Sequence, residues 1–225
     1  QKTAYEMLRS LVGSEMCIRD RTMHPRVRIP AGAGALAAAL LMFSCATGAV
    51  LNVTYQLPGP TAAPSFRPVG IGVVDARAER AILTPRAREE LAGAGEVFAL
   101  TVAAPGRSTE LRGAYPLEAL LKEILRLRLE QAGIPVAAAG SPEARVVLAV
   151  EEFRLDFGDR RWIAAFAFEA RVERGGKVAA RQSVRGSNER MMLLKKPDAE
   201  KVLGELVTDT LNQLDPADLL RRAGL

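Results

Sequence analysis

Histidine and cysteine are nearly absent from this chain of 225 residues. Its one histidine is His24, and its two cysteines are Cys17 and Cys45. The 180 residues that follow Cys45 contain neither residue type. They can therefore form no Cys-containing zinc site, cysteine nucleophile, Ser-His triad or disulfide framework. We expect no metal, no cofactor and no catalytic residue in this part of the chain.

Aromatic residues and net charge are also low. Aromatics make up 5% of the chain, whereas sugar-binding clefts usually depend on them, and the single tryptophan, Trp162, fits a strand core or a sheet surface. Six of the 31 Lys and Arg and three of the 26 Asp and Glu precede Cys45, which leaves 25 minus 23, or +2, for the rest. So small a charge gives no reason to expect a nucleic-acid partner.

The longest apolar run is short and lies near the N-terminus. It covers residues 29–44, follows the basic segment Met23 to Arg28 and ends at Cys45. A bilayer crossing needs about 20 residues, whereas Ile29 to Phe43 supplies 15 that include a proline and two glycines. The pattern is typical of a bacterial secretion signal. An ordinary cleaved signal peptide is the closest alternative to the interpretation that follows.

The four residues that end this run, Met42, Phe43, Ser44 and Cys45, resemble the lipobox of bacterial lipoproteins. The pattern departs from the lipobox at Phe43, where a small residue is usual. The resemblance implies that Cys45 is lipidated, becomes the first residue of the mature protein and joins it to a membrane through acyl chains. Ala46 replaces the aspartate that often retains lipoproteins at the inner membrane, which favours the outer membrane, facing the periplasm.

The chain divides into four segments. Residues 1–22 precede a Met that begins a well-formed signal and resemble a translated sequencing adapter, so we treat them as a non-native leader. Residues 23–44 form the signal peptide. Residues 45–68 hold the lipidated Cys45 and a flexible tether rich in proline and small residues. Residues 69–225 are expected to form a single globular domain, which is long enough to bury a core.

Within that domain the pattern predicts alternating strands and helices. Strands are expected at 69–75, 96–102, 145–157 and from Trp162 onward. A short helix follows its cap at Thr84, a long helix runs from Leu117 to Ala132 before Gly133, and another follows Pro197 with Asp198 as cap. A final turn covers 217–222. The fold class is α+β: a mixed, mostly antiparallel sheet with two long helices on one face.

Two hairpins can be given a register from their apolar faces. A turn at 158–161 pairs Phe157 with Trp162 and Phe153 with Phe166, so that both apolar sets share one side. For the next hairpin, a three-residue loop at 175–177 with a glycine-assisted bulge pairs Val172 with Ala180 and Phe168 with Val184.

Two charged groups are candidate binding sites. Asp75 and Arg77 follow a predicted strand and could hold a ligand, although a strand-end aspartate more commonly caps a turn. A basic patch near the sheet end could touch acidic lipid or polysaccharide headgroups, or could be a solvated surface. Its residues are Arg185, Arg190, Lys195 and Lys196.

Two further features concern the predicted sheet. Its outer face carries Ile163, Ala165 and Ala167, apolar enough for a covering layer or a protein contact. Carboxylates at Glu151, Glu152 and Asp156 are the remaining candidates for a hydrolase that needs only paired acids. The glycines are too loosely spaced for a phosphate-binding loop.

Taken in order, several weak motifs resemble the YajG-type family of bacterial lipoproteins from Cys45 to about Leu214. The resemblance implies an envelope lipoprotein and no particular activity. We therefore expect a membrane-anchored, periplasm-facing lipoprotein that acts non-enzymatically as a binding or assembly component of the envelope, with an envelope protein or lipid as partner. An accessory lipoprotein of lipid or lipopolysaccharide transport and a carboxylate-dependent hydrolase are the alternatives. The motifs are the lipobox and residues 52–58, 73–77, 129–133 and 153–155.

Overall fold

The computed structural model describes residues 50–59, 66–104, 107–138 and 142–225. Cys45 and the predicted leader and signal segments lie outside the described residues, so their assignments stay predictions. The segment from Thr47 to Leu225 forms one compact unit. All elements described below belong to this unit.

The larger of two sheets has four strands in the order β2-β5-β6-β7. Strand β2 runs parallel to β5, and the other neighbours are antiparallel. This sheet and the long helices confirm the predicted α+β class. The strands are β2 (Gly70–Asp75), β5 (Ala144–Gly158), β6 (Arg161–Arg174) and β7 (Lys177–Met191).

The second sheet was not predicted. It has the order β1-β3-β4, with β1 (Leu51–Gln56) parallel to β3 (Phe98–Ala104) and β3 antiparallel to β4 (Arg107–Tyr115). The tether prediction is therefore wrong for Leu51–Gln56. Leu51, Val53 and Tyr55 alternate with polar residues and are fully buried, as one face of a strand requires.

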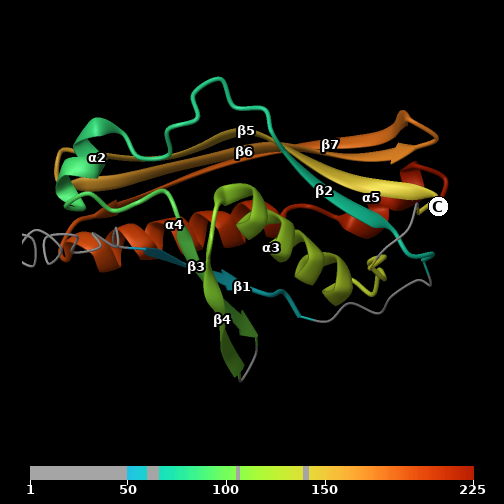
Figure 1. The fold of residues 1–225 in the computed structure, drawn as a ribbon, viewed down its shortest axis with the longest axis horizontal. Helices are drawn as coiled ribbons and strands as arrows, with labels where there is room; N and C mark the ends of the chain where they lie inside the picture. The colour runs from blue at the N-terminus through green and yellow to red at the C-terminus, as the bar shows by residue number, and fades with distance from the viewer. Residues whose placement is uncertain (1–49, 60–65, 105–106, 139–141) are drawn as a thin grey trace, which may run out of the picture. The chain divides into compact units, whose positions relative to one another are not determined.

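Both long helices and the small sheet lie on the same side of the large sheet (Figure 1). Helix α3 (Leu117–Gln131) packs against β2, and α4 (Lys195–Asn212) packs against β6, β7 and β1. Between them, Phe98 of β3 meets Phe153 of β5 edge-on, with ring centroids 6.1 Å apart. The short helices α2 (Pro85–Glu90) and α5 (Pro216–Arg222) lie close to β5 and β7 respectively.

The first hairpin has the predicted register. Phe157 pairs with Trp162 and Phe153 with Phe166. The turn residues Asp159 and Arg160 both have positive φ angles, of 50° and 58°, which is the geometry of a type I′ turn. Trp162 is fully buried, which places it in the core.

The second hairpin corrects the predicted loop. Its turn contains only Gly175 and Gly176, both with positive φ, and Glu173 pairs with Val178. The register then shifts between Val172 and Glu173, so that Val172 still pairs with Ala180 as predicted. The extra residue therefore lies in the strand, as a bulge, and not in the loop. Both arrangements bury the same apolar residues, and the two glycines favour the tighter turn.

Of the two predicted helix caps, the one at Thr84 is confirmed and the one at Asp198 is wrong. Thr84 caps α2 by accepting a hydrogen bond from the backbone N–H of Ala87, as predicted. Asp198 does not cap α4, because the helix begins three residues earlier, at Lys195. Its carboxylate instead accepts hydrogen bonds from the backbone N–H groups of Leu193 and Leu194.

Candidate functional site

The N-terminal strand β1 is attached to α4 by side chains. One edge of β1 pairs with β3, and its other edge faces residues of α4 that recur every four positions. Glu200 accepts from the backbone N–H of Asn52 at 2.9 Å, and Thr208 accepts from that of Gln56 at 3.0 Å. Asn212 donates to the Gln56 carbonyl at 3.1 Å. Side chains thus supply the hydrogen bonds that another strand would otherwise make.

The fourth member of this stripe is Gly204. A Cβ at this position would lie 2.8 Å from the Thr54 carbonyl oxygen and 3.2 Å from the Thr54 nitrogen. Only a residue without a side chain lets the helix approach the strand this closely. The start of the folded unit is therefore held by a close backbone contact as well as by hydrogen bonds.

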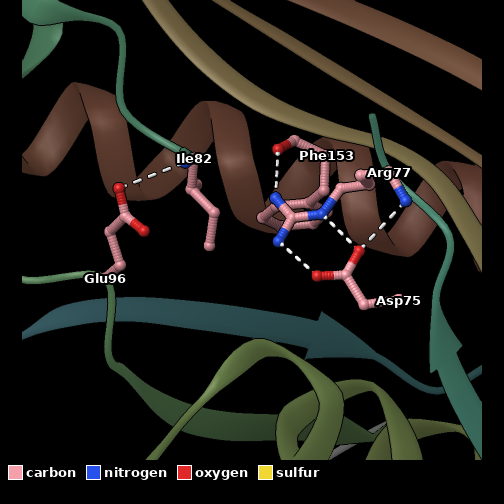
Figure 2. A network of polar contacts seen from close by, with 5 residues as sticks. All are labelled: Asp75, Arg77, Ile82, Glu96 and Phe153. Atoms are coloured by element: carbon pink, nitrogen blue, oxygen red, sulfur yellow. Dashed lines mark hydrogen bonds and ion pairs between the residues drawn. The ribbon is translucent and has the colours of Figure 1, made fainter. Parts of the chain in front are cut away.

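Asp75 and Arg77 form a two-point ion pair at the end of β2 (Figure 2). Arg77 Nε lies 2.9 Å from Asp75 Oδ1, and Nη2 lies 3.0 Å from Oδ2. The side chains of Arg77 and Asp75 are 6% and 12% exposed. These hydrogen bonds from Arg77 hold the pKa of the Asp75 carboxyl below its usual value.

The charged groups of Asp75 and Arg77 bind each other and the neighbouring backbone, so neither is free to bind a ligand. The backbone N–H of Arg77 also donates to Asp75, as a turn-capping aspartate requires. Arg77 Nη1 donates to the Phe153 carbonyl at 3.1 Å. Phe153 lies beyond Val150, the last residue of β5 that pairs with β2. The chain returns to β5 at Ile82, whose N–H donates to Glu96 (Figure 2). The Ile82 carbonyl accepts from the N–H of Leu155. The capping interpretation therefore fits better than the ligand one.

The three carboxylates proposed for a hydrolase do not act as one group. Asp156 accepts hydrogen bonds from the Thr84 hydroxyl at 2.6 Å and from the Phe157 N–H at 2.8 Å, so it supports the α2 cap. Glu151 and Glu152 line a hollow of about 270 Å³ that Asp156 does not line. In the described part of the chain, no three His, Cys, Asp or Glu side chains gather in a way that could hold a metal ion.

The basic patch predicted near the sheet end is largely neutralised. Arg190 Nη2 lies 2.8 Å from Glu205. Lys195 Nζ lies 2.8 Å from Glu90, and Lys196 Nζ lies 3.6 Å from Glu200. Glu205 and Glu90 come from other elements, so the local sequence could not reveal them, whereas Glu200 lies four residues after Lys196 in the same helix. The solvated-surface interpretation of the patch is the one that fits.

The outer face of the large sheet is less open than its sequence suggested. Ile163 is 38% exposed, but Ala167 is almost completely buried. Ala167 lies between Glu152 on β5 and Arg185 on β7, and long side chains of this kind can cover small apolar neighbours. No covering layer of helices is needed to explain this burial.

The turn between β7 and α4 carries an apolar group that the sequence prediction missed. Met191, Leu193 and Leu194 are 61%, 82% and 63% exposed. We call these three residues the apolar tip. The run Met191-Met192-Leu193-Leu194 was a visible signal, because four successive apolar residues fit neither the alternation of β7 nor the stripe of α4.

A cavity of about 330 Å³ lies beside α5. Phe66, Leu220 and Leu225 supply its apolar lining. Its polar lining is an ion-pair network in which Glu143 binds both Arg67, at 2.9 Å, and Arg174. The hydrogen bonds from these two arginines lower the pKa of the Glu143 carboxyl. We call this hollow the α5 cavity.

Comparison with known proteins finds no sequence match and solved structures of low similarity. No protein-family model matches the chain, and no curated protein sequence matches it. Similar solved structures include a Xanthomonas campestris protein of the family DUF330, with 16% identity, 79% of this chain and 97% of that chain covered, and a TM-score of 0.49. A lipoprotein from Neisseria meningitidis has 16% identity, 65% and 97% coverage, and a TM-score of 0.24. Scores this low carry no conclusion about function.

Proposed function

We propose that this chain is a lipid-anchored protein of the bacterial cell envelope that works by binding and not by catalysis. The observation that carries the proposal is the position of β1. This strand begins at Leu51, six positions after Cys45, and is attached to α4 along its whole outer edge. Six extended residues span about 20 Å. Acyl chains on Cys45 would therefore hold the folded unit close to the membrane surface.

Several contacts support a non-enzymatic role. The candidate acid Asp156 is occupied by Thr84 and Phe157, and the candidate pair Asp75 and Arg77 is occupied within the fold. The segment after Cys45 also lacks every histidine and cysteine. The outer membrane is the proposed location because Ala46 follows the lipidated position.

The proposal is tested by replacing Cys45. We expect Cys45→Ser to lose incorporation of radiolabelled palmitate and to retain its signal peptide, because the thiol is the acceptor of the lipid. Globomycin should likewise block cleavage of the unaltered protein. Cys17→Ser is the matched control, because Cys17 is the second cysteine of the chain and lies before the proposed cleavage point. This variant should be labelled and processed normally. Normal processing of Cys45→Ser would disprove lipidation at this residue.

A second candidate role, accessory lipoprotein of a lipid transport system, is favoured by the α5 cavity. Its apolar lining and the excess of one arginine over its single glutamate suit an anionic amphiphile. Binding of a fluorescent fatty acid to the processed protein tests this role. We expect saturable binding that Phe66→Glu abolishes while the far-UV circular dichroism stays unchanged, because Phe66 lines the cavity and is only partly buried. Equal binding by the two proteins would exclude the cavity as the site.

A further inference from the structure

The apolar tip is the most exposed apolar group in the described chain. Three other large apolar side chains reach the surface, and they are between 38% and 46% exposed. They are Val74, Ile163 and Val178, which lie on three different strands, β2, β6 and β7. Met191, Leu193 and Leu194 are each more than 60% exposed and almost adjacent. Clustered exposure of this kind marks an interaction surface, whereas single exposed apolar residues do not.

The turn that carries the tip is held in a defined conformation. Met192, between the exposed residues, packs against the core, and its N–H donates to the Arg160 carbonyl at 2.8 Å. The Asp198 carboxylate accepts from the N–H groups of Leu193 and Leu194. Because the backbone is fixed on both sides, the two leucines cannot turn inward together without breaking these hydrogen bonds.

The tip lies at the end of the unit where β1 begins. Glu200, in the second turn of α4, binds the N–H of Asn52 at 2.9 Å and also contacts Lys196 at 3.6 Å. The start of α4 is close to α2 and far from the C-terminus (Figure 1). The described chain therefore begins at the end of the unit that carries the tip.

The charges around the tip are balanced. Lys195 pairs with Glu90, Lys196 with Glu200, and Arg190 with Glu205. Arg161 pairs with Glu189 at 2.9 Å on the neighbouring strands. These four cations are each paired with an acid, so we expect contact between this end and a membrane to depend mainly on its apolar side chains.

We propose that the apolar tip inserts into the bilayer that anchors Cys45, at the boundary between headgroups and acyl chains. This inference rests on the proposed function, because lipidation of Cys45 is what brings this end to a membrane. A bilayer fits better than a protein partner, because the tip projects from a turn at the end of the unit where β1 begins, six positions after Cys45, and lines none of the described cavities. Apolar side chains on a rigid projection bind at this interfacial depth. The tip then acts as a second attachment, which fixes the orientation of the unit.

The scarcity of cysteine makes the test specific. In the processed lipoprotein Cys17 has been removed and the Cys45 sulfur is acylated, so Leu193→Cys introduces the only free thiol. The thiol is labelled with the fluorophore NBD, and the full processed protein is reconstituted into vesicles of phosphatidylethanolamine and phosphatidylglycerol. Quenching by phospholipids with doxyl-labelled acyl chains is then measured. Val178→Cys is the matched control, since Val178 is also apolar and exposed but lies at the opposite end of β7 from Met191.

We expect the probe at 193 to be quenched several-fold more strongly than the probe at 178, with no change at high salt. Equal, weak quenching at both positions would overturn the insertion. A blue-shifted probe at 193 that doxyl lipids do not quench would also overturn it and would indicate a second copy or another protein on the tip. Parent protein without an introduced cysteine should take up no NBD. If it is labelled, Cys45 is free, and the proposed function fails together with the insertion.

Discussion

Side chains complete two of the strand edges that lack a neighbouring strand, and they do so in different ways. Along β1, one helix supplies Glu200, Thr208 and Asn212, which are eight and four positions apart. Beyond the end of β2, the edge of β5 is completed by one guanidinium, that of Arg77. The first arrangement spreads its hydrogen bonds over three side chains, and the second concentrates them in one ion pair.

This difference matters because the two edges differ in exposure. The contacts of Gln56 with α4 lie at the surface, where water can replace a lost partner. Arg77 and Asp75 are almost buried, so removal of either side chain leaves the other charge without its ion-pair partner. Loss of a partner from a buried polar group costs more free energy than loss of an exposed contact. The two edges should therefore respond very differently to substitution.

The largest effect is expected from Arg77→Leu. It removes the guanidinium that binds the Asp75 carboxylate and the Phe153 carbonyl, and we expect it to lower the free energy of unfolding by about 2–4 kcal/mol. Urea denaturation measures this change. Arg88→Leu is the control, since Arg88 also lies 2.9 Å from its partner Glu96 but is half exposed, and it should cost less than about 1 kcal/mol. Equal losses of unfolding free energy in the two variants would mean that burial does not make the Arg77–Asp75 pair more important than the Arg88–Glu96 pair.

A smaller loss is expected from Gly204→Ala at the β1 edge. The added methyl group would meet the backbone of Thr54 at 2.8 Å and force α4 away from the strand. Overpacking costs about 1–3 kcal/mol, against a gain of about 1 kcal/mol in helix propensity. Hydrogen exchange should accelerate selectively at the amides of residues 51–56. Gly158→Ala, where nothing lies within 4 Å of the added Cβ, should leave exchange there unchanged.

The ion pair should also contribute to acid sensitivity. Arg77 lowers the pKa of Asp75 in the folded state below the unfolded value of about 3.9. This contribution to stability is therefore present above about pH 4 and is lost as the pH falls through the folded pKa. The gap in unfolding free energy between the parent and Asp75→Asn should narrow from pH 7 to pH 3. A gap of constant size would contradict the role of the charged carboxylate.

The smallest effect on stability is expected at the apolar tip, which belongs to neither edge. Leu193 is 82% exposed, so Leu193→Asp should change the free energy of unfolding by less than about 0.5 kcal/mol. Thermal unfolding of the processed protein checks this value. A loss of more than about 1 kcal/mol would show that the tip is a structural contact within the fold, in contrast to a surface available to a membrane.

The predictable parts of this fold are those whose signals are local. The stripe from Leu117 to Leu125 and the stop at Gly133 predicted α3, and the matching apolar faces of Phe153 and Trp162 set the register of a hairpin. The small sheet was missed because β1 pairs in parallel with β3, more than 40 positions away along the chain. Short strands with distant partners leave little trace in one segment.

The candidate sites divide in the same way. Local sequence located Asp75, Arg77, Lys195 and Lys196, but each has a partner whose contact the sequence alone did not predict. The apolar tip was visible as four successive apolar residues. Its exposure was not visible, because a run of this kind is equally compatible with burial until the surrounding elements are placed.

By itself, the sequence determined the α+β class, the hairpin faces and the absence of histidine and cysteine after Cys45, because each depends on residue identity or on periodicity within one segment. Only the tertiary structure decided that Leu51–Gln56 is a strand completed by α4, that the basic residues are neutralised, and that Met191, Leu193 and Leu194 remain outside. These outcomes depend on which distant groups meet, and contacts between distant segments are set by packing of the whole unit.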